Sequence, residues 1–207
     1  MGEVYNSHKM SEPKQSSLGL LVLLYLSQGP AHAYGLHKQM KDMGKDRVVN
    51  LRSRTSVYQV MRRLERDGLI TPAGTTSAGG YSDRTNYQIT DRGRTIATAW
   101  LDAMLASTGE EFPEFSTALS VLFLLPPEEA QSQLETRRDR LRNLLAEAEA
   151  AINGAPDGLP RLFLLDELHR QTILTAELAW TESLITELAN SSLTWTAEWI
   201  AQLANNP

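Results

Sequence analysis

The sequence of 207 residues contains no cysteine, which excludes disulfides, thiolate nucleophiles and sulfur-ligated metal sites. It also lacks a long hydrophobic run, because the longest, Leu18 to Leu26, includes Gly19 and is far too short to span a bilayer. No small-residue cleavage pattern of a signal peptide follows the polar start of the chain. These absences predict a soluble cytoplasmic protein without a membrane partner.

Histidine is scarce as well, and the four histidines His8, His32, His37 and His169 lie in separate segments. Asp166 shares a helical face with His169, but such a pair without further ligands is more often structural than a metal site. No Ser-His-Asp arrangement can be assembled. We therefore expect no enzyme activity, no metal and no cofactor.

Charge is unevenly distributed along the chain, although the net charge is only −5. Residues 14–94 contain 13 Lys or Arg against 6 Asp or Glu, a net charge of +7, whereas residues 95–207 contain 6 against 17, a net charge of −11. Fields are screened within about 8 Å at physiological salt, so each half acts locally. The basic half is therefore where a polyanionic partner is expected.

The basic half begins with three helical patterns. The first covers Leu18–Leu26 and is followed by a Gly29-Pro30 stop, and the second runs from about Ala33 to Met43. The third lies within Thr55–Ile70, where Gly68 occupies the position of a left-handed C-terminal residue.

A hairpin and a fourth helix follow. Short β-compatible runs at Leu69–Thr71 and Tyr87–Ile89 flank a loop rich in Gly, Ser and Thr, which predicts a hairpin with a long loop. Thr90-Asp91 then begins a helix that reaches about Ala106. This order of elements predicts a winged helix-turn-helix DNA-binding domain over residues 14–106.

The third helix of such a fold enters the major groove by its N-terminal end, which also attracts phosphate. Val57, Val60 and Leu64 recur at helical spacing and are expected to face the core. The predicted DNA contacts around this helix are Arg52, Arg54, Thr55, Ser56, Tyr58, Gln59, Arg62 and Arg63. The alternative is that the pair Arg62 and Arg63 consists of ordinary solvated surface residues without a role in binding. The Gly-rich segment Gly74–Gly80 lacks the Gly-Lys-Ser/Thr of a phosphate-binding loop.

Three motifs point to a known family: GPAHAYGL at Gly29–Leu36, VYQVMRRLERDGLI at Val57–Ile70 and NYQITDRGR at Asn86–Arg94. Through them, the segment Leu20–Leu101 resembles PadR-type transcriptional regulators. The resemblance implies a dimeric winged-helix repressor, and recognition roles for Ser56, Tyr58 and the wing residue Arg84.

The sequence also departs from the family pattern. Thr55 replaces the usual Gly, Ser56 replaces Thr, Gln59 replaces Pro, and only Arg84 remains of the basic run of the wing. We therefore expect an operator that differs from the common ones, with less charge contributed by the wing.

The acidic half, residues 107–207, is predicted to be an all-helical dimerisation domain. Pro126-Pro127-Glu128-Glu129 is typical of a helix start, and that helix is expected to reach Ile152. A charge run on it is expected to be an exposed face of mixed charge and consists of Arg137, Arg138, Arg140 and Arg142. The turn Asn153–Pro160 then leads into a last long helix.

Apolar residues at coiled-coil-like spacing on the last helix predict a dimer interface formed by Leu174, Leu178, Ile185 and Leu188. The pattern continues to Trp195 and Trp199, although Asn190-Ser191-Ser192 is able to break the helix. Packing within one chain is the alternative that this pattern leaves open.

Aromatic residues near the junction of the halves suggest an effector site. Trp100, Phe112 and Phe115 are expected to line a pocket for a small aromatic or apolar ligand that releases DNA; ordinary junction core is the alternative. Together, the sequence predicts a mainly α, DNA-binding homodimeric repressor of a palindromic operator. The competing function is a winged-helix module that binds a protein and not double-stranded DNA, and the net charge of +7 argues against it.

Overall fold

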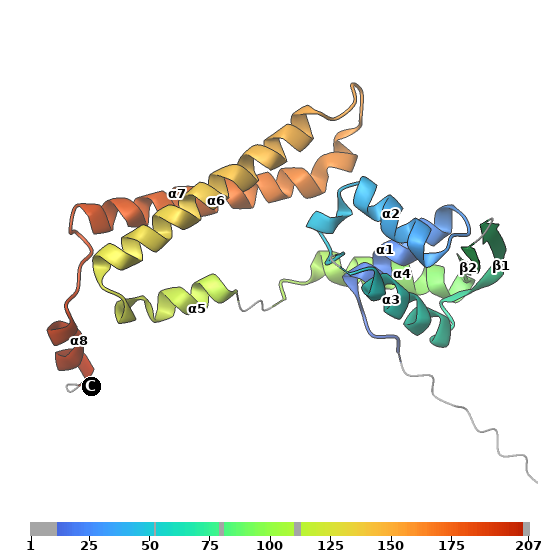
Figure 1. Cartoon of the computed structure of the whole chain (residues 1–207), viewed down its shortest axis with the longest axis horizontal. Helices are drawn as coiled ribbons and strands as arrows, with labels where there is room; N and C mark the ends of the chain where they lie inside the picture. The colour runs from blue at the N-terminus through green and yellow to red at the C-terminus, as the bar shows by residue number, and fades with distance from the viewer. Residues whose placement is uncertain (1–11, 52, 79–80, 110–112, 205–207) are drawn as a thin grey trace, which may run out of the picture. The chain divides into compact units, whose positions relative to one another are not determined.

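The computed structural model of the protein describes residues 12–51, 53–78, 81–109 and 113–204. The chain divides into two compact units, Met1–Gly109 and Glu110–Pro207. Figure 1 shows a winged helix-turn-helix with a two-stranded wing in the first unit and helices alone in the second. The predicted fold class is confirmed. The last helix of the first unit ends at Ala106, and the domain boundary after that residue stays a prediction.

Side-chain caps begin the helices of the first unit. Ser16, His32, Ser53 and Thr90 each accept a hydrogen bond from a backbone N–H in the first turn of the helix that follows. The helices are α1 (Ser17–Gln28), α2 (Ala33–Asp42), α3 (Arg54–Arg66) and α4 (Asp91–Ala106), with the short 3-10 helix η1 (Lys45–Arg47) after α2. Their apolar faces form one core that includes Val22, Leu23, Leu26, Leu36, Met40, Val57, Leu64 and Trp100.

The wing consists of β1 (Ile70–Ala78) and β2 (Tyr81–Ile89), which pair antiparallel. Both strands are longer than predicted, because Gly74, with φ +106°, lies where the register shifts between Pro72 and Thr75. A glycine in this left-handed region allows a bulge, so it bends the strand without ending it. Gly68, with φ +70°, ends α3 as predicted.

Thr90 and Gly93 join the base of the wing to α4. The Thr90 hydroxyl accepts from the Gly93 amide at 3.0 Å, and its proton is shared between the Gly68 carbonyl oxygen at 2.9 Å and the Leu69 carbonyl oxygen at 3.1 Å. The contact at Gly93 is so close that an added Cβ would lie 2.1 Å from that oxygen. The base of the hairpin and the first turn of α4 therefore pack as one piece.

The second unit is built on two long helices that lie side by side (Figure 1). Its elements are α5 (Glu114–Ser120), η2 (Leu122–Leu124), α6 (Pro127–Asn153), η3 (Arg161–Leu164), α7 (Leu165–Ala189) and α8 (Ala197–Ala204). The helix start at Pro126-Pro127 is confirmed. α7 ends at Ala189, and Ser191, with φ +60°, lies in the segment before α8. The last helix is thus interrupted at Asn190–Ser192.

The predicted seam on α7 packs within the chain. Leu174, Ile185 and Leu188 are buried, and Leu178 is half-buried, in clusters that also contain residues of α6 such as Leu134 and Leu141. Since α6 of the same chain already covers these side chains, the structure supports the intramolecular alternative for this face.

Two arginines of the run on α6 form ion pairs with glutamates of α7, so this face is not purely solvated. Arg137 pairs with Glu177, and Arg142 pairs with Glu182 at 2.6 Å. Arg138 bonds its neighbour Asp139 at 2.9 Å, which raises the pKa of Arg138 and lowers that of Asp139. Exposed pairs of this kind are weak, because solvent screens them, so apolar packing holds the two helices together.

Candidate nucleic-acid interface

α3 is divided into a buried face and an exposed face. Val57, Met61 and Leu64 are at most 3% exposed. The exposed side chains include those of Thr55, Tyr58, Gln59 and Arg62, and Arg66 is exposed in the last turn, where it pairs with Asp67. Each of Thr55, Tyr58, Gln59 and Arg62 lies three or four residues from two of the others, so the four form a single face that carries hydroxyl, amide and guanidinium groups. This face can donate and accept hydrogen bonds without disturbing the core.

The remaining predicted contacts on and near α3 differ in their placement. Ser56 is half-buried, and its backbone amide bonds the Ser53 carbonyl oxygen. Arg63 is also half-buried, and its Nε and Nη2 atoms are buried without a hydrogen-bond partner among the described residues. Arg52 lies outside the described residues, as does the side chain of Arg54. Arg62 is therefore the exposed arginine of the predicted pair.

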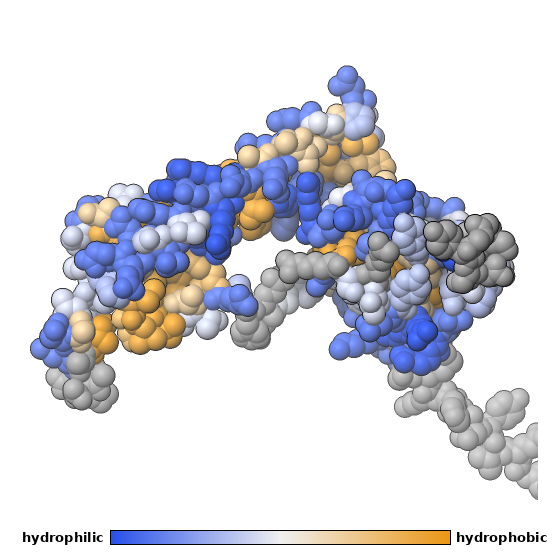
Figure 2. Space-filling model, in the orientation of Figure 1, coloured by the Kyte–Doolittle hydropathy of each residue, from blue (hydrophilic) through white to orange (hydrophobic). Residues whose placement is uncertain are grey.

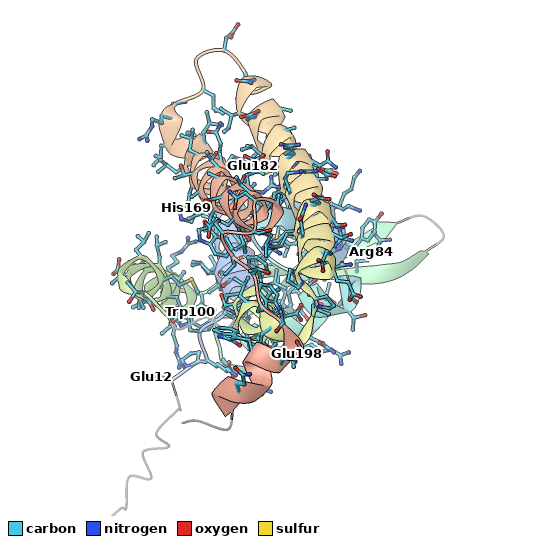
Figure 3. The ribbon with its side chains drawn as sticks, turned by 90° about the vertical axis from the view of Figure 1, so that its left-hand side faces the viewer. Glu12, Arg84, Trp100, His169, Glu182 and Glu198 are labelled. Carbon is cyan, nitrogen blue, oxygen red and sulfur yellow. The ribbon has the colours of Figure 1, made fainter. Side chains whose placement is uncertain are left out.

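The wing is attached to α2 and α3 by specific contacts. Arg84 on β2, labelled in Figure 3, places its guanidinium carbon 4.8 Å from the ring centroid of Tyr34 on α2. Tyr87 exchanges backbone hydrogen bonds with Ala31, at 3.1 and 2.9 Å. The Tyr87 hydroxyl also donates to the Glu65 carboxylate of α3 at 3.2 Å. These contacts fix the strand that carries Arg84 to α2, to the turn before it and to the C-terminal half of α3.

Burial raises the pKa of Tyr87 above its ordinary value of 10.0, and the charge and hydrogen bond of Glu65 raise it further. The positive charge of Arg62 acts in the opposite direction on the same pKa. Tyr87, Glu65 and Arg62 are thus electrostatically linked, and Tyr87 stays a neutral donor near pH 7.

Residues of α2 and the following loop extend the polar surface and were not predicted as site residues. A hollow of about 890 Å³ near the start of α3 is lined by His37, Lys41, Asp46, Arg47, Val48, Val49, Asn50 and Leu51. The first helix of a helix-turn-helix crosses the DNA backbone. Lys41 is exposed here. Its positive charge and its position on the second helix were the sequence signals that could have predicted a contact with the DNA backbone. The sequence-based prediction of DNA contacts covers only the third helix and the wing.

The second unit contains an apolar cavity of about 730 Å³ between α5, η2, α6 and α7. Phe115 lines it, with Leu134, Leu141 and Leu174 among the apolar residues and Arg137 and Arg140 among the polar ones. The Arg137 guanidinium lies 3.5 Å from the Phe115 ring centroid. Apolar side chains of η2 are also exposed, and Figure 2 shows an apolar patch in this part of the unit.

The three aromatic residues of the predicted effector pocket are not brought together within one unit. Trp100 is buried in the core of the first unit, and Phe115 belongs to the second. Phe112 lies outside the described residues. Of the three, only Phe115 is seen to line a cavity.

Neither a metal site nor a membrane-spanning helix is found in the described part of the chain. It contains no group of three or more His, Asp or Glu side chains placed to hold a metal ion. Of the helices it describes, none has the length and apolar character needed to cross a membrane.

Residues 22–99 match the model of the Transcriptional regulator PadR-like family. The structure of Bacillus subtilis PadR in complex with operator DNA is 19% identical in sequence with a TM-score of 0.65, covering 84% of this chain and 99% of that one. The structure of the same protein in complex with p-coumaric acid is 15% identical in sequence with a TM-score of 0.61, covering 85% of this chain and 99% of that one.

The virulence activator AphA of Vibrio cholerae is 24% identical with a TM-score of 0.63, again covering 84% of this chain and 99% of that one. No curated protein sequence matches the chain. At these identities the likeness to the solved structures is one of fold, and it extends through both units.

Proposed function

We propose that this protein, whose residues 22–99 belong to the PadR-like family of transcriptional regulators, is a DNA-binding regulator of transcription. The observation that carries the proposal is the division of α3 into a buried apolar face and an exposed hydrogen-bonding face. The operator complex of Bacillus subtilis PadR, which shares the fold, supports it. A protein-binding module would not need the net charge of +7 in residues 14–94.

Separate roles follow from the chemistry of the exposed side chains. Gln59 offers the bidentate hydrogen-bonding pattern that suits adenine in the major groove. A good contact of this kind discriminates against the wrong base by about 1–3 kcal/mol. Arg62 suits guanine or phosphate, and Arg84 on the wing suits the DNA backbone. Thr55, Ser56 and Tyr58 supply hydroxyls near the helix N-terminus, where phosphate is favoured.

The test is a gel shift with the DNA upstream of the gene that encodes the protein. We expect binding that weakens steeply with salt, each neutralised phosphate adding roughly 0.9 to the slope of log affinity against log salt. Gln59→Ala should relax preference at one base position, whereas Arg84→Ala should weaken all sequences alike and reduce the slope by about 1.

Arg161→Ala, in η3 of the second unit, is the matched loss of one exposed cation and should leave binding unchanged. Failure to bind any DNA, or affinity that does not respond to salt, would contradict the proposal. An identical uniform loss for Gln59→Ala and Arg84→Ala would contradict the division of roles alone.

The proposed regulator is a cytoplasmic homodimer that represses from a palindromic operator, with half-sites about 34 Å apart or a multiple of that distance. The buried seam on α7 leaves another face for the partner. Ile173 and Trp180, which lie outside this seam on α7, are 53% and 48% exposed. An apolar stripe of this kind on paired helices suits packing against a second copy.

We further propose that a small aromatic acid binds in the cavity of the second unit and weakens operator binding. The volume of about 730 Å³ is typical of a ligand pocket, and the lining is apolar with few polar groups. Arg140 has no ion-pair partner among the described residues, so it is available to a carboxylate. The p-coumaric acid complex of Bacillus subtilis PadR supports this class of ligand.

The effector is tested by titrating p-coumaric acid while tryptophan fluorescence and operator affinity are followed together. Trp180 is a suitable reporter, because its ring lies edge-on to Phe115 at 6.0 Å between centroids. A hundredfold loss of operator affinity requires roughly 2.7 kcal/mol of preference for the non-binding form.

Phe115→Ala should abolish both responses, whereas Phe123→Ala, on the exposed side of η2, should retain them. A fluorescence change without loss of operator affinity would mean a pocket without a switch. No response to any aromatic acid would contradict the effector site.

A further inference from the structure

The Gly29–Leu36 motif, which carries part of the family resemblance, has a physical role at the base of the wing. Ala31 pairs with Tyr87 of β2 through two backbone hydrogen bonds. The next residue, His32, caps α2, because its Nδ1 accepts the Gly35 amide at 2.9 Å. The turn is therefore fixed to the wing on one side and to α2 on the other.

Three side chains continue outward from this turn. The rings of His32 and Tyr34 are stacked at 6.2 Å between centroids with an interplanar angle of 23°. The guanidinium of Arg84 lies over the Tyr34 ring at 4.8 Å. Tyr34 is only half-buried, so this arrangement is at the surface and within reach of a ligand.

The contact with Tyr34 restricts Arg84 without consuming its hydrogen bonds. A cation–π contact uses the face of the guanidinium, whereas its N–H donors point outward in the plane of the group. A long side chain that is already held in place loses less rotamer freedom when it binds. Arg84 is thus prepared to donate to a phosphate.

We propose that Tyr34 is a positioning residue that holds Arg84 in the conformation in which it contacts the DNA backbone. The inference rests on the proposed function, because it presupposes that the wing touches DNA. It assigns to α2 a part in recognition that is exerted through the wing and not by direct contact with a base.

The experiment measures operator affinity for Tyr34→Leu and Tyr34→Phe, each alone and combined with Arg84→Ala. Removing the ring should weaken binding about threefold to fivefold, which is the size of an exposed cation–π contact. Tyr34→Phe keeps the ring and should stay within about twofold of the unmodified protein. In the Arg84→Ala background, Tyr34→Leu should have no further effect.

Matched controls separate positioning from folding. Gln39→Ala changes an exposed residue of the same helix and should leave affinity unchanged, and Tyr34→Met provides a second ring-free side chain if Tyr34→Leu lowers the melting temperature. The proposal is overturned if Tyr34→Leu leaves operator affinity unchanged, or if Tyr34→Phe lowers it as much as Tyr34→Leu does. It is also overturned if Tyr34→Leu still lowers operator affinity in the Arg84→Ala background. Absence of DNA binding by the unmodified protein would instead refute the proposed function.

Discussion

Gly93 lies in the first turn of α4, where the helix meets the base of the wing. An added Cβ would lie 2.1 Å from the Leu69 carbonyl oxygen and 2.8 Å from a side-chain carbon of Ile89. Because the nearer atom belongs to the backbone, it cannot rotate away. The glycine is thus required by close approach, although it lies inside a helix.

We expect Gly93→Ala to destabilise the first unit by about 3 kcal/mol, near the upper end of the usual cost of overpacking. Urea denaturation followed by circular dichroism measures the change. Gly109→Ala is the control, because its Cβ would meet only the Ser107 hydroxyl oxygen at 3.5 Å. Equal stability of the Gly93→Ala and unmodified proteins would show that the junction adapts.

The candidate site was predictable at single residues where periodicity decides orientation. Val57 and Leu64 had to face inward, so Tyr58, Gln59 and Arg62 had to face outward, and the structure places them there. Arg63 was not predictable in this way, because a long side chain can fold back onto the protein and bury its polar atoms. The contact between Tyr34 and Arg84 was also not predictable, since the two residues are distant in sequence.

At the scale of elements, the attachment of β2 to α3 depends on the neutral form of Tyr87. The pKa of Tyr87 is raised by burial and then by Glu65, so it exceeds its value in the unfolded chain. The stabilisation is therefore complete below about pH 10 and is lost as the pH rises through the folded-state pKa. Between pH 6 and 9 this contact should not change.

We expect Glu65→Gln to lower the pKa of Tyr87 without restoring it fully, because burial is the larger cause. The measurement is tyrosinate absorbance during alkaline titration, with the Tyr87→Phe protein subtracted. Glu114→Gln, in the second unit, should leave the titration of Tyr87 unaltered. A Tyr87 pKa that does not respond to Glu65→Gln would contradict the contact.

Elements were predictable where a local signal fixed their ends. Pro126-Pro127 and Gly68 marked a helix start and a helix stop correctly. The sequence predicts short strands for the wing because Gly74 is typical of a loop, whereas in the structure backbone pairing continues past it. The seam on α7 had the correct apolar face, but spacing alone cannot tell whether a neighbouring helix belongs to the same chain.

At the scale of the whole molecule, the proposed dimer predicts different effects for substitutions on the exposed face of α7 and for substitutions in its buried seam. Ile173→Asp should weaken the dimer without loss of helix content, because Ile173 is 53% exposed in one chain. Leu178→Asp with Ile185→Asp should unfold the second unit, since both side chains pack against α6 clusters. Sedimentation velocity at micromolar concentration, together with circular dichroism, distinguishes these outcomes.

Thr175→Asp is the matched control, because Thr175 is exposed on α7 away from the stripe. A stable monomer of the unmodified protein would contradict the dimer. A dimer that Ile173→Asp leaves intact would contradict this face as the interface.

The tight junction at Gly93 couples α4 mechanically to the wing. α4 has 16 residues and is therefore about 24 Å long, and its first turn cannot slide on the base of the wing. Trp100 fixes the middle of the same helix in the core of the first unit. A movement of about 4 Å at the far end of α4, near Ala106, therefore turns the whole unit by roughly 10° and carries the wing and Arg84 with it, without any hinge inside the wing.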